Sequence, residues 1–152
     1  MINLSADIRN LSSSLGQAEL ELCLSEMIII IEDRLDVYVE YINGDNSYWV
    51  PTPDFELEEC DVPFGIIELG DDQSVFLKIV SLSHEVGHCI FRKDGTFQSI
   101  DCTLFRESAA WYLGYHFMLE CGYSINMEEY NKEVTYAIDL YRRSENARNV
   151  KQ

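Results

Sequence analysis

The chain has 152 residues, of which 47% are hydrophobic and 12% aromatic, and this composition excludes a disordered polypeptide. The net charge of −16 is uneven, because residues 1–75 carry 17 acidic and 2 basic residues whereas residues 76–152 carry 10 and 9. An acidic half repels phosphate, so no direct binding to nucleic acid is expected. It predicts either a solvated surface or a docking face for a basic protein, such as a DNA-binding regulator; a DNA-mimicking decoy is a third alternative.

The sequence predicts a cytoplasmic location. No N-terminal stretch combines a basic start with an apolar run, so no signal peptide is expected. The longest strictly apolar run, residues 27–31, is too short to span a bilayer, so no membrane partner is expected either. The five cysteines are odd in number and form no C-x-x-C pair, which predicts free thiols in a reducing compartment: Cys23, Cys60, Cys89, Cys102 and Cys121.

The first half of the chain predicts one helix and several short strands. Apolar residues recur at helical spacing over residues 17–34, although the β-branched stretch at 28–31 leaves a strand as an alternative there. Residues 36–42 are β-branched and aromatic, and Asn43-Gly44 predicts a tight turn into a returning strand at 47–50. The segment 51–63 holds all three prolines and predicts an irregular surface excursion, after which residues 65–69 form another short strand.

The second half predicts three helices. The first runs from an N-cap at Ser74 to about Phe91 and is followed by a polar loop that contains Asp94-Gly95. The second is expected from about Asp101 to Cys121, with Gly122 as its end. Asn126 is placed to cap the third helix, whose first turn is acidic and whose later part is basic, as the helix dipole favours.

These elements predict a single α+β domain over residues 1–152, in which an N-terminal helix and a small, mostly antiparallel sheet precede three helices. No internal repeat, low-complexity tract or linker divides the chain. No glycine-rich phosphate loop is present, so nucleotide chemistry has no support.

A metal-binding pattern occupies residues 84–88, which read His-Glu-Val-Gly-His and hold two of the three histidines. Residues four apart share one face of a helix, so His84 and His88 could hold one Zn²⁺ between them. Glu85 could then reach a water molecule at the metal and act as a general base. The alternative is a pair of ordinary partly buried or surface histidines beside an incidental glutamate.

A catalytic zinc usually has a third protein ligand, and Glu107 and His116 are the candidates. Both lie on the predicted helix after residue 101, nine residues apart, so they point to opposite faces and only one can meet the metal. Glu107 is favoured because Ala110 and Gly114 share its face and would let the two helices pack closely. The alternative is a surface glutamate paired with a nearby arginine.

Other polar residues near the pattern are given smaller roles. His116 is expected to be a packed or rim histidine, and it is one of three candidates, with Tyr112 and Tyr115, for stabilising developing negative charge. Ser81 lies near the angle of His88 on the helix and could orient a metal ligand. Cys89 points about 100° further round the helix from His88 and lacks a positioned base, so it is expected to be a packed thiol.

Two segments resemble the ImmA/IrrE family of zinc metallopeptidases. Residues 80–88, Val-Ser-Leu-Ser-His-Glu-Val-Gly-His, are similar to its first motif, in which a lead of hydroxyl residues and leucine precedes His-Glu-x-Gly-His. Residues 107–114, Glu-Ser-Ala-Ala-Trp-Tyr-Leu-Gly, resemble its second motif, in which a metal-binding glutamate is followed three residues later by alanine.

The resemblance implies a zincin-like metallopeptidase fold, with the His-Glu-Val-Gly-His pattern on an active-site helix, and roles for particular residues. His84, His88 and Glu107 would ligate Zn²⁺, and Glu85 would be the general base. Members of the family cleave helix-turn-helix repressors, which would suit an acidic docking half. The expected function is therefore a cytoplasmic zinc-dependent endopeptidase that acts on a protein substrate. The alternative is a non-catalytic acidic binding or inhibitor protein in which a structural metal stabilises the fold.

Overall fold

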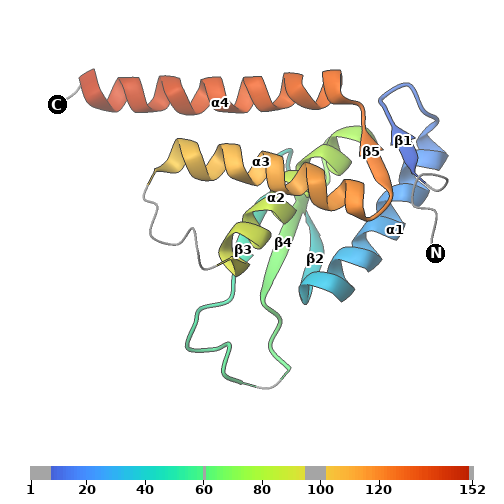
Figure 1. Ribbon diagram of the computed structural model, residues 1–152, viewed down its shortest axis with the longest axis horizontal. Coiled ribbons are helices and arrows are strands. Elements are labelled where there is room, and N and C mark those ends of the chain that lie inside the picture. Colours follow the sequence, from blue (N-terminus) through green and yellow to red (C-terminus); the bar gives the residue numbers. More distant parts are fainter. Residues whose placement is uncertain (1–7, 60, 95–101, 151–152) are drawn as a thin grey trace.

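The computed structural model describes residues 8–59, 61–94 and 102–150, and it contains four helices and five short strands in these ranges (Figure 1). The α+β class predicted from the sequence is therefore confirmed. In chain order the elements are β1 (Arg9–Leu11), α1 (Gln17–Leu35), β2 (Val37–Ile42), β3 (Tyr48–Pro51), β4 (Gly65–Gly70), α2 (Val75–Lys93), α3 (Thr103–Glu120), β5 (Tyr123–Ile125) and α4 (Met127–Val150).

The helix ends follow the predicted capping residues. The Ser74 hydroxyl accepts a hydrogen bond from the backbone N–H of Leu77 at the start of α2, and the Asn126 side chain accepts one from the N–H of Glu129 at the start of α4. Gly122 follows α3 with φ +95°, a left-handed conformation that suits glycine. Asp101, the predicted first residue of α3, and Gly95, in the predicted loop before it, lie outside the described residues.

The main sheet differs from the prediction. Its strand order is β2-β4-β3, with β4 parallel to β2 and antiparallel to β3, so the sheet is mixed and the predicted hairpin between β2 and β3 is wrong. The strand β4 is the most buried of the three, with four of its six residues buried, and it takes the central position. Residues 43–47 span the two strand spacings, about 10 Å, between the outer strands.

A second, two-stranded sheet pairs β1 in parallel with β5. Neither strand was predicted, because three residues are too few to show an alternating pattern. The Glu26 carboxylate on α1 accepts hydrogen bonds from the Tyr123 hydroxyl at 2.7 Å and from Arg9 at 2.9 Å. This ion pair and hydrogen bond join both strands of the small sheet to α1.

The core joins the helices to the main sheet. Side chains of α1, α2, β2 and β4 meet in it, including Met27, Val37, Ile67 and Ile79. α3 packs along α2, and the long α4 lies along α3 (Figure 1). In the part of the chain that the structure describes, no helix combines the length and apolar character that crossing a membrane requires.

Candidate metal centre

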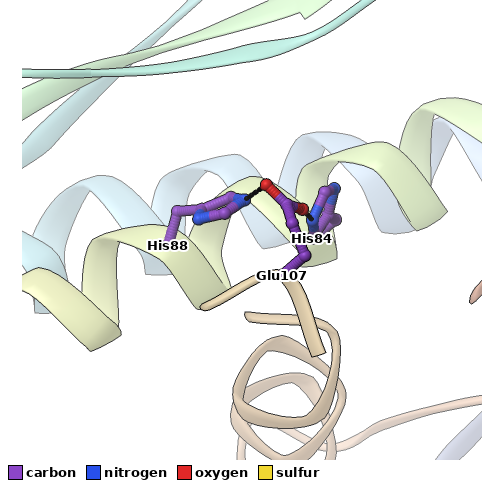
Figure 2. A group of neighbouring side chains, drawn as sticks. All are labelled: His84, His88 and Glu107. Carbon is purple, nitrogen blue, oxygen red and sulfur yellow. Dashed lines mark hydrogen bonds and ion pairs between the residues drawn. The ribbon is translucent and has the colours of Figure 1, made fainter. Parts of the chain in front are cut away.

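The helix α2 places His84 and His88 side by side. The two residues are one helical turn apart, their side chains are only partly exposed, and their ring centroids lie 4.7 Å apart. Glu107 comes from the first half of α3, where this helix meets α2, and its carboxylate lies between the two imidazoles (Figure 2). The two helices therefore bring two nitrogen donors and one carboxylate to one point.

The distances within this group suit a small cation. The Nε2 atom of His84 lies 2.8 Å from Oε2 of Glu107, and Nε2 of His88 lies 3.3 Å from Oε1 of the same carboxylate. Ligand atoms from all three residues lie within 4.8 Å of one another. A tetrahedral Zn²⁺ with bonds of about 2 Å separates its ligands by about 3.3 Å. The three donors could therefore hold a metal ion, and zinc is among the ions that they suit.

Small residues let α2 and α3 approach closely enough for this meeting. A side-chain carbon added at Gly87 of α2 would overlap the backbone carbonyl of Ala110 on α3. One added at Gly114 of α3 would overlap the carbonyl of Ser83 on α2. Ala110 and Gly114 thus lie on the contact face that helical spacing assigned to them. Gly87 completes this contact from the opposite helix, which sequence reasoning did not identify.

Burial and mutual hydrogen bonds set the charge of the three residues. Burial lowers the pKa of the His84 imidazole. Burial acts in the same direction on His88, but the hydrogen bond and the negative charge of Glu107, together with the charge of Glu85, outweigh burial and raise the pKa of His88. Burial alone would raise the pKa of the Glu107 carboxyl, yet the hydrogen bonds from both imidazoles hold that pKa below its usual range. Glu107 is therefore an anion held between two imidazoles.

Glu85 lies beside the group but is differently placed. Its side chain is only 9% exposed, and its Oε1 atom lies 3.6 Å from Nδ1 of His84. Burial raises the pKa of the Glu85 carboxyl to about 8, although the charge of His88 and, less strongly, a hydrogen bond from the backbone of Trp49 on β3 oppose this rise. Glu85 is therefore a buried carboxyl with a raised pKa, and a nearby positive charge would lower that pKa.

A cavity of about 450 Å³ opens over this group. His84, Glu85, His88 and Glu107 line it together with segments on either side. One wall is residues 45–49, which lead into and begin β3, and the other includes Ala137 and Tyr141 of α4. The donor group is thus accessible to a ligand rather than closed off.

Two aromatic residues that sequence reasoning missed contact the proposed ligands. The Trp111 indole stacks on the His84 imidazole with centroids 3.9 Å apart and planes 4° from parallel. The Tyr141 hydroxyl donates a hydrogen bond to Oε1 of Glu107 at 3.0 Å, and burial raises the pKa of Tyr141 to about 12, so the donor stays protonated. In the sequence, both residues resemble ordinary packing aromatics, so no signal identified them.

The other candidates from the sequence lie elsewhere. His116 is exposed, and its ring contacts Tyr112 and Tyr115. None of these three is among the described residues that line the cavity. Ser81 does line the cavity, but its hydroxyl donates a hydrogen bond to Gln73 rather than to a proposed ligand.

The cysteines give no competing site among the described residues. Cys23, Cys89, Cys102 and Cys121 are all free thiols, as predicted, and Cys60 lies outside the described residues. Cys89 is fully buried, and burial raises the pKa of its thiol to about 12, which makes it a poor nucleophile.

Comparisons with known proteins found no relative of this chain. Neither a scan against protein-family models nor searches of curated proteins and of solved structures found a match to the chain.

Proposed function

We propose that the chain is a zinc-dependent endopeptidase. The observation that carries the proposal is the convergence of His84, His88 and Glu107 at the floor of an open cavity, with the buried Glu85 beside them. Structural zinc sites are closed by four protein ligands, whereas catalytic sites combine three protein ligands with an open position. Three donors at a cavity therefore favour a catalytic site over the alternative of a purely structural one.

The residues of the site suit peptide hydrolysis. His84, His88 and Glu107 would hold the ion, which would supply Lewis acidity to polarise a peptide carbonyl and to acidify water. Glu85 would accept a proton from the attacking water and return it to the leaving amine. Burial favours the protonated form of Glu85, and a neighbouring cation would favour its carboxylate, the form in which it can accept a proton.

We also propose a protein substrate with a basic surface. The acidic first half of the chain favours a basic partner, and the segment 45–49 of this half forms one wall of the cavity. The resemblance of residues 80–88 and 107–114 to the ImmA/IrrE motifs adds a DNA-binding regulator as the candidate class.

Replacement of Glu85 by glutamine tests the proposal. Glu85→Gln keeps the shape of the side chain but removes the proton acceptor, so we expect loss of cleavage while about one Zn²⁺ per chain is retained. The measurement is electrophoresis of candidate DNA-binding proteins from the same genome after incubation with each variant, together with metal analysis. Glu120→Gln, an exposed glutamate on α3, is the matched control and should change neither result.

Two outcomes would contradict the proposal. Full cleavage by Glu85→Gln would show that Glu85 is not the general base. Tight binding of a partner without cleavage by the unaltered protein would favour the non-catalytic binding protein instead.

A further inference from the structure

We infer that α4 is part of the metal centre and that its Tyr141 is a positioning residue for the proposed ligand Glu107. The inference rests on the proposed function, because it assigns the support of the same site. Tyr141 lies in α4, 34 residues after Glu107, and no motif in the sequence points to it.

The contacts of the Glu107 carboxylate show what the helix contributes. Its Oε2 atom meets His84 at 2.8 Å, whereas its Oε1 atom meets both His88, at 3.3 Å, and the Tyr141 hydroxyl, at 3.0 Å. Glu107 is only 8% exposed, so solvent supplies few hydrogen bonds to this carboxylate. A hydrogen bond such as the one from Tyr141 fixes the orientation of a carboxylate that binds a metal.

A separate contact, made by Tyr130, holds α4 against α3. The Tyr130 hydroxyl donates a hydrogen bond to the backbone carbonyl of Trp111, and the two rings meet edge to face with centroids 5.5 Å apart. Tyr130 and Tyr141 are eleven residues apart, which is close to three helical turns, so they share one face of α4. Tyr130 thus secures the helix against α3, and Tyr141 reaches Glu107.

The same face of α4 also borders the cavity. Ala137, one turn before Tyr141, lines it, and its single methyl group leaves the space above the metal ligands open. One face of α4 therefore carries both the hydroxyl that contacts Glu107 and residues that line the cavity.

The test is the zinc affinity of Tyr141→Phe, which keeps the ring and removes only the hydroxyl. Affinity is measured by competition with a chromophoric chelator, and the visible spectrum of the Co²⁺-loaded protein reports the ligand geometry independently of activity. We expect a loss of about 10- to 100-fold in zinc affinity, as is typical when the partner of a metal ligand is removed. We also expect a changed Co²⁺ spectrum.

Two control variants separate positioning from packing. Tyr136→Phe alters a tyrosine of α4 that is 66% exposed and should leave zinc affinity unchanged. Tyr130→Phe removes the hydrogen bond that secures the helix, so it should lower the thermal midpoint without a tenfold loss of zinc affinity.

Each remaining outcome overturns the inference. An unchanged affinity in Tyr141→Phe, or an equal loss in Tyr130→Phe, would show that the Tyr141 hydroxyl does not position Glu107, and the proposed function would stand. Failure of the unaltered protein to bind Zn²⁺ would overturn the inference and the proposed function together.

Discussion

Glu107 and His116 show that the position of a residue on a helix determines whether it can reach the candidate metal centre. They lie nine residues apart on α3, and Glu107 faces α2 and is nearly buried, whereas His116 is exposed beside Tyr112. An imidazole is a common zinc ligand, but His116 lies on the wrong face to reach the other two histidines. The carboxylate of Glu107 is therefore the third donor that the structure brings to the pair.

Separate alanine substitutions of these two residues test this assignment. Glu107→Ala removes a proposed ligand and should lower zinc affinity by about 100-fold or more, whereas His116→Ala should leave it unchanged. Competition with a chelator of known zinc affinity measures both variants, and circular dichroism checks that they fold. Equal losses from the two substitutions would be inconsistent with the helical-face argument.

Among single residues, the sequence predicted the proposed metal ligands but not the residues that contact and position them. His84 and His88 lie on one helix, so their spacing follows from helix geometry and needs no knowledge of the fold. Glu107 lies on the next helix, and it was favoured because Ala110 and Gly114 share its face. Trp111 and Tyr141 act across elements, because one stacks on a ring of α2 and the other reaches Glu107 from α4. Contacts between separate elements depend on how those elements pack, and no local pattern records them.

At the level of secondary structure, the candidate metal centre depends on the close contact between α2 and α3. Gly87 and Gly114 each lie against a backbone carbonyl of the opposite helix, so the two backbones are closer than side chains would allow. Without this approach, Glu107 would not lie between the imidazoles. The glycine in the His-Glu-Val-Gly-His pattern therefore has a packing role that is separate from metal binding.

Substitution of Gly87 by alanine should push these helices apart. The added methyl group would overlap the Ala110 carbonyl, so we expect a loss of about 1–3 kcal/mol in the free energy of unfolding and a lower zinc affinity. Urea denaturation and chelator competition measure the two effects. Ser108→Ala, at an exposed position of α3, should not lower either quantity. Native stability and zinc affinity in Gly87→Ala would refute the close contact.

The strands were predicted less well than the helices. Local composition located β2, β3 and β4 but not their partners, and β4 lies between the two strands that were expected to form a hairpin. Strand pairing is a contact between distant segments, so it depends on which strand is buried most. The helices, by contrast, are formed by local hydrogen bonds and end at local capping residues.

For the whole molecule, the question is which of its many potential donors would hold the proposed zinc ion. The chain has three histidines, five cysteines and a large excess of acidic residues, any of which could bind zinc. The described cysteines are free, and Cys89 follows His88 directly, but its buried thiol does not belong to the group formed by His84, His88 and Glu107. A measurement that identifies the ligand atoms would distinguish these possibilities.

X-ray absorption at the zinc edge on the zinc-loaded protein is that measurement. The centre described above predicts about one Zn²⁺ per chain, with imidazole nitrogen and carboxylate oxygen neighbours at about 2.0–2.2 Å and no sulfur. A sulfur neighbour at about 2.3 Å, or a spectrum without two imidazoles, would place the ion elsewhere and contradict the assignment of His84, His88 and Glu107.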